Sequence, residues 1–276
     1  MDETEHAAPS TPGTQPVTLA IPRDLTIKVL GIGGTGGIVS DYVALWLNIL
    51  ASTHARSSIR LVLLDGDVFE PANTRMHFSA YGNKAIVKRD ELRSRLGERL
   101  GGLLIDAVDQ FVSPENIAQL LHEDDVVLLC VDSHASRKLV SDYFGSRIRN
   151  GVLISAGNDG VGPDTGGQVL RGTFGNCQIY IRREGEDRSP ALDRYHPEIA
   201  DPGDTLPTDK ACTDLVASVP QLLFANFWAA ASMLSTLYLA LCESGALRYS
   251  ELVFDFAEGI VRPVDIPEPR MDKQAG

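Results

Sequence analysis

A glycine-rich segment near the N-terminus, Gly31-Ile32-Gly33-Gly34-Thr35-Gly36-Gly37, has the spacing of a dinucleotide-binding turn. It lies between an aliphatic run, Thr26 to Gly31, and a stretch of helical periodicity from about Ile38 to Ala51. Side chains in such a turn would keep phosphate oxygens away from the backbone N–H groups and from the positive end of the helix. The segment predicts a phosphate-binding turn, with close helix packing as the structural alternative. The candidate residues are Gly31, Gly33, Gly34 and Gly36.

Two carboxylates follow the next apolar run, Ile59 to Leu64. The first of them, Asp65, has the position at which a doubly wound sheet holds a ribose diol, and Asp67 comes two residues later. The polar segment that follows includes Arg75. A triphosphate needs cations to match its charge, whereas a hydride-transfer site does not, so these residues favour ATP over NAD.

The elements that must position these residues alternate as βαβαβαβ from Thr26 to about Ser155. The continuous apolar strands are typical of a parallel sheet that is covered on both faces. Further along, a predicted hairpin at Phe174-Gly175-Asn176, between strands at 168–173 and 178–182, and closing strands at 251–256 and 260–263 extend the sheet. We therefore expect an α/β fold, a Rossmann-like, doubly wound and mostly parallel sheet extended by antiparallel strands.

The domain organisation is predicted to be simple. Residues 1–22 are rich in Pro, Thr and acidic residues and form a disordered arm, residues 23–264 form a single domain, and residues 265–276 form a polar tail. A charged, proline-containing segment at about 183–212 is expected to be a long crossover loop. The segment 221–242 carries no charged residue, and we expect a buried core helix rather than a membrane span.

Composition limits the partners. With 37 acidic and 25 basic residues, the formal charge of −12 disfavours nucleic acid and anionic membranes, and a basic partner or a small charged substrate fits better. The four cysteines have no spacing that could build a zinc site, so no zinc is expected. The composition favours a reducing, cytoplasmic compartment.

Taken as an ordered set, these motifs resemble the ThiF/MoeB and ubiquitin-activating-enzyme family. The set comprises the glycine turn, Asp65 to Arg75, Gly82-Asn83-Lys84-Ala85, and Cys130-Val131-Asp132 with Arg137. The resemblance implies a ThiF-like adenylation domain. Such an enzyme attacks the α-phosphate of ATP with the C-terminal carboxylate of a small ubiquitin-like or sulfur-carrier protein, which releases pyrophosphate and leaves an acyl-adenylate.

The same resemblance assigns roles to individual residues. Asp65 would hold the ribose, Asn73 and Arg75 would contact the phosphates, Lys84 would stabilise charge at the α-phosphate, and Asp132 would place Mg²⁺. The Arg75 and Lys84 positions each fall one residue short of the family spacing, so Lys88 or Arg89 could serve instead. The alternatives are that Arg75 and Lys84 are solvated surface charges and that Asp132 is a helix N-cap.

The second half is similar to a bacterial branch of ThiF-like proteins that is carried with PRTRC-type gene clusters. The matching residues are Gly157-Asn158, Gly167-Gln168-Val169, Ala211-Cys212, Gln221 and Asn226. This places Cys212 at the end of the crossover loop, where a mobile acyl-accepting cysteine would lie. Lys210 and the start of the next helix would lower the pKa of its thiol. The alternative is a cysteine that only fills space, the role we expect for Cys130 and Cys242.

Three functions compete at this point. The first is an ATP-dependent adenylyltransferase that acts on the carrier protein, possibly through a Cys212 thioester and a downstream conjugating protein. The second is an NAD-dependent oxidoreductase, which lacks an obvious proton donor in the sequence. The third is a non-catalytic nucleotide-binding adaptor of the same fold. The family resemblance also implies a homodimer.

Overall fold

The computed structural model describes residues 24–53, 58–71, 73, 76, 78–97, 102–163, 167, 169–209, 221–241 and 247–265. The predicted N-terminal arm and most of the polar tail lie outside the described residues, as do Arg75, Cys212 and Cys242.

One nine-stranded sheet runs through the molecule in the order β13-β12-β10-β7-β6-β1-β2-β5, with β11 paired to β10. The strands β5, β2, β1, β6 and β7 are parallel, and β10, β12 and β13 add antiparallel pairs. This arrangement confirms the predicted fold class. The bounds are β1 Leu25–Leu30, β2 Ile59–Leu64, β5 Leu103–Val108, β6 Val126–Leu129, β7 Gly151–Asn158, β10 Phe174–Arg183, β11 Glu186–Asp187, β12 Tyr249–Asp255 and β13 Ile260–Asp265.

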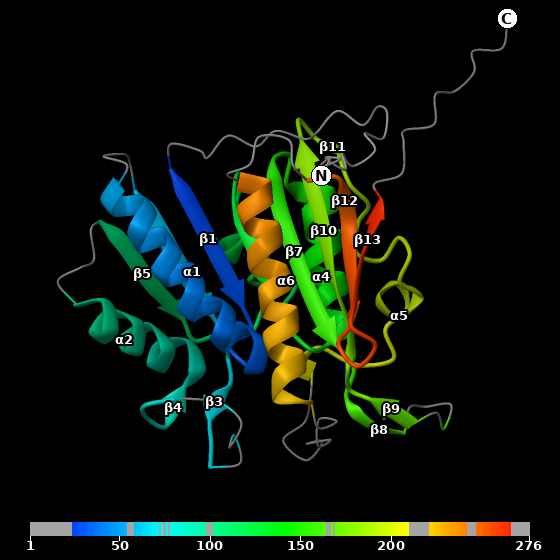
Figure 1. Ribbon diagram of the computed structural model, residues 1–276. Coiled ribbons are helices and arrows are strands. Elements are labelled where there is room, and N and C mark those ends of the chain that lie inside the picture. Colours follow the sequence, from blue (N-terminus) through cyan, green and yellow to red (C-terminus); the bar gives the residue numbers. More distant parts are fainter. Residues whose placement is uncertain are drawn as a thin grey trace, which may run out of the picture.

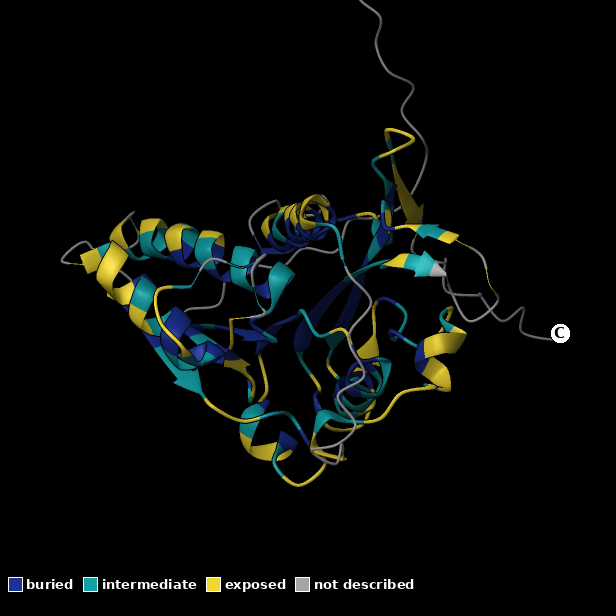
Figure 2. Ribbon diagram, turned by 90° about the horizontal axis from the view of Figure 1, so that it is seen from below, coloured by how far each residue is buried: buried dark blue, intermediate teal, exposed yellow. Residues whose placement is uncertain are grey.

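Helices cover both faces of this sheet (Figure 1, Figure 2). The first face carries α1 Gly34–Thr53, α2 Lys84–Leu96 and α6 Leu223–Leu241, and the second carries α3 Ile117–Leu120, α4 His134–Arg147 and α5 Pro197–Ala200. Two small hairpins and a 3₁₀ turn complete the described elements. They are β3 Val68–Phe69 with β4 Gly82–Asn83, β8 Val161–Pro163 with β9 Val169–Arg171, and η2 Pro207–Asp209.

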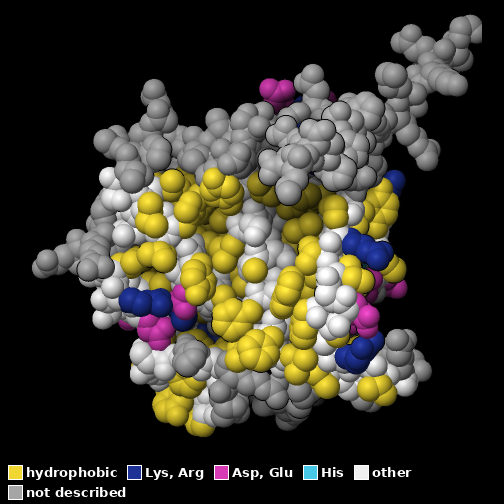
Figure 3. Space-filling model, viewed as in Figure 1, with side chains coloured by type: hydrophobic (Ala, Val, Ile, Leu, Met, Phe, Trp, Pro, Cys, Tyr) yellow, Lys and Arg dark blue, Asp and Glu magenta, His cyan; other side chains and the backbone are white. Residues whose placement is uncertain are grey.

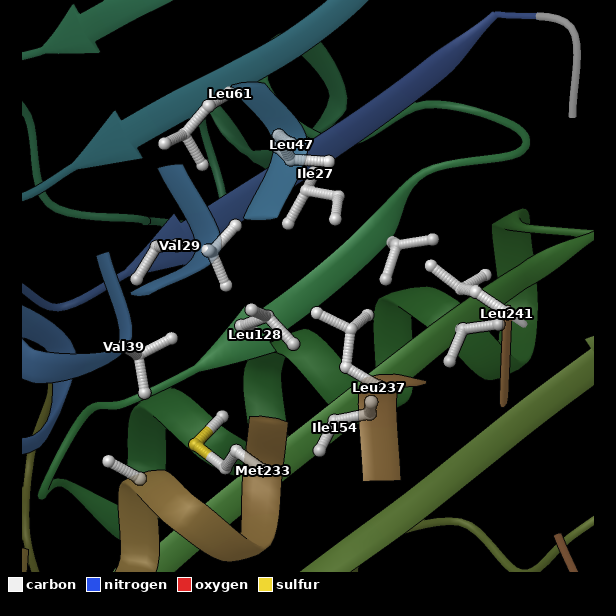
Figure 4. Close-up of a cluster of buried hydrophobic side chains, with 14 of the residues drawn as sticks. Ile27, Val29, Val39, Leu47, Leu61, Leu128, Ile154, Met233, Leu237 and Leu241 are labelled. Carbon is white, nitrogen blue, oxygen red and sulfur yellow. The ribbon is translucent and has the colours of Figure 1, made fainter. Parts of the chain in front are cut away.

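The apolar strands pack alternately into two cores, one on each face of the sheet. Successive residues of a strand point to opposite faces, so Val29 joins the core under α1 and α6 while Leu30 joins the core under α4. Figure 4 shows Ile27, Leu61, Leu128 and Ile154 of the sheet in the first core. Burial of each such side chain contributes about 1.5–3 kcal/mol. Two-sided burial explains why most positions in these strands are apolar rather than alternating with polar ones.

The predicted hairpin at Phe174-Gly175-Asn176 is wrong. These residues lie inside the long strand β10, which pairs with β7 on one side and β12 on the other, whereas β9 pairs with β8. Gly175 is needed within the strand because a Cβ there would collide with the ring of Phe254 and with the carbonyl oxygen of Gly157. The glycine thus marks a close approach inside a strand and not a turn.

The prediction of a buried core helix holds for only one face of α6. In the part of the chain that the structure describes, α6 is the one helix long and apolar enough to cross a membrane, and half of it is buried inside the protein. Ala229, Met233 and Leu237 pack in the core, while Phe224 and Phe227 are exposed. The other face of this uncharged helix is therefore an apolar surface.

Gly36, in the first turn of α1, packs against the backbone of Gly31, and this contact generates a stability prediction. A Cβ at position 36 would collide with the carbonyl oxygen of Gly31, whereas a Cβ at Gly37 would meet no described atom within 4 Å. We expect Gly36→Ala to destabilise the protein by about 1–3 kcal/mol through overpacking. Gly37→Ala should be neutral or stabilising by up to about 1 kcal/mol, because alanine favours helix. Thermal unfolding followed by circular dichroism compares the two variants, and equal midpoints would contradict the proposed packing.

Candidate functional site

A cavity of about 210 Å³ opens at the carboxyl ends of β1, β2 and β6. The chain leaves β1 into α1 on one face of the sheet and leaves β6 into α4 on the other face (Figure 1). The crevice where neighbouring parallel strands diverge in this way is the usual ligand site of an open α/β sheet. The glycine turn, Asp65, Asp67, Lys84 and Asp132 all line this one cavity.

The glycine turn forms the floor of the cavity. Gly31 has a φ of +86°, a conformation that favours glycine, and a Cβ at Gly33 would meet no described atom within 4 Å. The backbone at Gly33 is therefore open to a ligand at the start of α1, where helix N–H groups favour anions. Gly36 does not line the cavity and supports the turn from below.

Asn226 of α6 holds the turn from the side. Its Oδ1 accepts a hydrogen bond from the Thr35 hydroxyl at 3.3 Å, and its Nδ2 lies so close to Gly34 that a Cβ there would collide with it. Asn226 is buried. The sequence placed Asn226 only in a family motif and gave no reason for a contact between residues so far apart in the chain.

Asp65 joins the end of β2 to the glycine turn. Its Oδ2 accepts the Ile32 N–H at 2.5 Å and its Oδ1 accepts the Asp67 N–H at 2.9 Å. Burial raises the pKa of this carboxyl above its ordinary value, although the two backbone hydrogen bonds and Lys84 oppose the rise. Each carboxylate oxygen can accept a further hydrogen bond, so the predicted contact to a ribose diol fits this geometry.

Lys84 enters the cavity from the first residue of α2. Asn83 caps that helix, with its Oδ1 accepting the Ile86 N–H at 3.1 Å, and its Nδ2 donates to the carbonyl oxygen of Asp65 at 2.7 Å. The Lys84 ammonium is buried and pairs with Asp67. Lys84 is therefore not a solvated surface charge, and it is held beside the cavity by the same residues that position Asp65.

The two substitute cations do not line the cavity. Lys88 is buried and pairs with Asp41 at 3.4 Å and Glu91 at 3.1 Å, while Arg89 pairs with Asp90. Asn73 also lies outside the cavity lining, and its side chain accepts the Glu70 N–H at 2.7 Å to form a turn. Of the candidate cations that the structure describes, Lys84 is the one at the cavity.

Asp132 follows β6 and is exposed at the cavity wall. It is not the N-cap of α4, because the Ser133 hydroxyl accepts the Ser136 N–H at 3.2 Å in that role. The crossover segment supplies a second cap, since the Asp204 carboxylate accepts the N–H groups of His134 and Ala135, both at 2.9 Å. Asp132 is thus left available to a ligand, with no ion-pair partner among the described residues.

Arg137 of α4 forms the rear wall of the cavity. Its buried guanidinium donates to the carbonyl oxygens of Val131 and Ala156 at 3.1 Å each, and burial lowers its pKa. Gly157 leaves the space that the guanidinium occupies, because a Cβ there would collide with it. Arg137 therefore ties the ends of β6 and β7 together.

Part of the cavity lining is apolar and suits a nucleobase. Phe111 packs against Gly66, where a Cβ would collide with the ring. The sequence analysis missed this wall, although a glycine directly after Asp65 was a visible signal of a close approach. The apolar lining is Leu30, Leu64, Phe111, Val112, Leu129, Val131 and Val140.

Two cysteines are described, and neither is suited to nucleophilic chemistry. Burial raises the pKa of the Cys177 thiol to about 12 and also raises that of Cys130. A thiol needs to ionise to act as a nucleophile, so both agree with the space-filling role expected for buried cysteines. Cys212 lies outside the described residues.

Several solved structures of other proteins share this fold. The chain resembles crystal structures of E. coli MccB. A structure of MccB described as the microcin C7 biosynthetic enzyme in complex with N-formylated MccA matches with a TM-score of 0.62 and 16% identity, over 92% of this chain and 68% of that chain. For MccB with ATP the TM-score is 0.57 at 15% identity, over 92% of this chain and 67% of that chain. For PaaA the TM-score is 0.58 at 13% identity, over 88% of this chain and 64% of that chain.

The chain thus spans about two thirds or slightly less of the length of these structures, and at such low identity they show the fold alone. A search of curated protein sequences finds no significant match. The narrower resemblance to the PRTRC-associated branch stays a prediction. The family model described as the ThiF family matches residues 21–218, most of the chain, including β1, β2 and β6, whose ends form the cavity, and the chain therefore belongs to the ThiF family.

Proposed function

We propose that the chain binds ATP in this cavity and uses it to adenylate the C-terminal carboxylate of a small protein or peptide. The observation that carries the proposal is the convergence of the glycine turn, Asp65, Lys84 and Asp132 on one cavity, although they come from four separate segments of the chain. Membership of the ThiF family supports the same reaction.

The charges in the cavity suit nucleotidyl transfer. The apolar lining takes the base, and Asp65 accepts hydrogen bonds from the ribose hydroxyls. The open backbone at Gly33 and the Lys84 ammonium face the phosphates. The carboxylate substrate attacks the α-phosphorus, an oxygen–phosphorus bond forms, and the bond to pyrophosphate breaks. Lys84 stabilises the negative charge that develops on the α-phosphate, which is the main catalytic task in phosphoryl and nucleotidyl transfer.

The residues also fit a magnesium ion. The described residues contain no group of three or more His, Cys, Asp or Glu side chains that could hold a metal. Mg²⁺, however, usually binds through one or two carboxylates together with substrate phosphates. Asp132 is an exposed carboxylate at the cavity without an ion-pair partner among the described residues, so it would hold Mg²⁺ beside ATP, where the ion would neutralise phosphate charge.

The proposed substrate is a ubiquitin-like or sulfur-carrier protein with a free C-terminal carboxylate. The similar MccB structures include complexes with ATP and with AMPCPP plus MccA, which supports a site that holds a nucleotide and a second molecule together. A site for NAD-dependent hydride transfer does not require a cation beside the glycine turn, so the buried Lys84 favours ATP over NAD. A non-catalytic adaptor would bind ATP without turnover.

Cys212 is the proposed acceptor of the acyl group after adenylation. The described part of the crossover segment reaches the cavity, because Pro207 lines it and Asp204 caps α4 beside Asp132. Cys212 comes five residues after Pro207 in the sequence, which an extended chain covers in about 17 Å. A thiolate there would displace AMP to form a thioester, in a reducing cytoplasm that keeps the thiol free, for delivery to a downstream conjugating protein.

We further propose that the apolar face of α1 and α6 binds a second copy of the chain. Figure 3 shows hydrophobic side chains gathered over this face, and α6 carries no charged residue. A chain with a net charge of −12 would repel its copy across a charged surface, whereas this face allows close contact. The exposed apolar residues are Tyr42, Leu45 and Ile49 of α1 and Leu223, Phe224, Phe227, Trp228 and Tyr238 of α6.

Removal of the Asp132 carboxylate tests the adenylation site. With a carrier protein, the wild-type chain should exchange labelled pyrophosphate into ATP, and Asp132→Ala should reduce this exchange at least about a hundredfold because charge neutralisation by Mg²⁺ is lost. Asp142→Ala, which removes an exposed carboxylate further along α4, is the matched control. Full exchange in Asp132→Ala would refute the assignment of Mg²⁺ to this residue.

Replacement of Cys212 separates adenylation from acyl transfer. We expect the wild-type chain, ATP and carrier protein to form a covalent complex that a thiol reductant cleaves, detected by mass spectrometry under denaturing conditions. Cys212→Ser should keep pyrophosphate exchange and lose the thioester, while Cys242→Ser keeps both. A thioester that persists in Cys212→Ser would assign the acceptor to another residue.

A charge placed on the apolar face tests the dimer. Light scattering after size-exclusion chromatography should give twice the chain mass of 29.9 kDa for the wild type. Phe227→Glu should give the monomer mass because a buried, unpaired carboxylate is costly at an interface. Leu104→Glu, at an exposed apolar position on the edge strand β5, should leave the dimer intact. A monomeric wild type would disprove the proposed interface.

A further inference from the structure

A second cavity, of about 370 Å³, adjoins the nucleotide cavity. The two share Asp132, Arg137, Gly157 and Asn158 as common walls, so a molecule whose carboxylate lies at the α-phosphate would extend into the second cavity. The remaining walls come from β10, β12, the crossover segment, the start of α4 and the segment after β7. They include Asp159, Asn176, Gln178, His196, Glu198 and Glu251.

Gln178, one of the residues that line this cavity, has a buried hydrogen-bond acceptor without a partner among the described residues. The residue is 6% exposed, and its Nε2 donates to the carbonyl oxygen of Leu192 at 2.9 Å. Its buried Oε1 has no hydrogen-bond partner among the described residues. A flip of the amide would put an oxygen against the Leu192 carbonyl, so the orientation is fixed. A buried acceptor without a donor costs about 1–3 kcal/mol, and a ligand N–H would remove that cost.

The charge around Gln178 is negative. The walls hold four carboxylates, Asp132, Asp159, Glu198 and Glu251, against Arg137 and the two histidines His134 and His196. Burial lowers the pKa of His134, which favours its neutral form. The Arg137 guanidinium donates to two main-chain carbonyls, and the His196 ring lies between Glu198 at 2.8 Å and Glu251 at 3.1 Å. These two carboxylates raise the pKa of His196, which favours its charged form. Even with His196 protonated, negative charges outnumber positive ones.

The negative charge of Asp159 is poorly balanced by the described residues around it. It has no ion-pair partner among the described residues, and burial together with the nearby Asp255 raises its pKa. A ligand cation beside Asp159 would stabilise the ionised carboxylate and oppose the rise in its pKa. An anionic ligand group would be repelled by the same walls.

We propose that the second cavity binds a lysine or arginine side chain that lies close to the C-terminal carboxylate of the substrate. The donors of such a side chain meet Asp159 and the free Oε1 of Gln178. This inference rests on the proposed function for the position of the carboxylate. Because the two cavities share walls, we place the cationic residue among the last three positions of the substrate chain. The substrate class is therefore a protein or peptide with a basic residue at its C-terminal end.

The test uses peptides because they carry the recognition element without a partner protein. Eight-residue peptides with a free C-terminal carboxylate and an N-terminal fluorophore carry lysine, norleucine or glutamate at one of the last three positions. Fluorescence anisotropy with a non-hydrolysable ATP analogue gives the Kd for the full-length chain. At one position, lysine should bind at least about tenfold more tightly than norleucine, and glutamate should bind most weakly.

A charge-removing variant assigns that preference to this cavity. Asp159→Asn should bring the lysine-to-norleucine ratio of Kd values close to one. Asp142→Asn is the matched control, because Asp142 is an exposed carboxylate on α4 that does not line the cavity, and it should keep the wild-type ratio. Equal affinities for lysine and norleucine at all three positions, no binding of any peptide, or a preference that survives Asp159→Asn would each overturn the inference.

Pyrophosphate exchange with the same peptides keeps the two proposals apart. Lysine-selective binding without exchange would count against adenylation and leave the cationic subsite standing. Exchange that proceeds equally well with lysine, norleucine and glutamate peptides would support adenylation and overturn the subsite.

Discussion

The hydrogen bond from the Ile32 N–H to the buried carboxylate of Asp65 is the contact on which the site depends. It joins the end of β2 to the turn after β1, so the ribose-binding candidate and the phosphate-binding candidate are fixed relative to each other before any ligand arrives. Burial of the carboxylate is costly, as its raised pKa shows, and two backbone N–H groups and the nearby Lys84 offset part of that cost. The same oxygens keep capacity for a ligand hydroxyl, so the structural and the binding roles coexist.

The supports of this arrangement come from distant parts of the chain. Asn226 of α6 holds the turn at Thr35, and Asp204 of the crossover segment caps α4 next to Asp132. Both contacts act on helix starts that border the cavity, and Asp204 accepts from two main-chain N–H groups that have no partner within α4. The second half of the chain therefore shapes the nucleotide cavity without supplying its central charged residues.

The sequence predicted the sheet well because its strands are buried on both faces and so are mostly apolar, as in Ile59–Leu64 and Val126–Leu129. It also predicted Asp65 from its position after a strand, and Lys84 and Asp132 from the family resemblance, and all three line the cavity. It failed where a glycine served a close approach: Gly175 suggested a turn but lies inside β10. Local sequence patterns could not predict the contacts of Asn226 and Gln178, because these contacts depend on how α6 and the crossover segment pack against the first half of the chain.

The uncharged helix α6 links the site to the apolar surface of the molecule. One face buries Met233 and Leu237 against the sheet, and the polar Asn226 on the same helix touches the glycine turn. The opposite face exposes Phe224 and Phe227. Phe227 also borders a cavity that Gly33 and Gly34 line. A partner bound on this face would therefore restrain the helix that supports the turn. Association and nucleotide binding would then be thermodynamically coupled, because each favours the same position of α6.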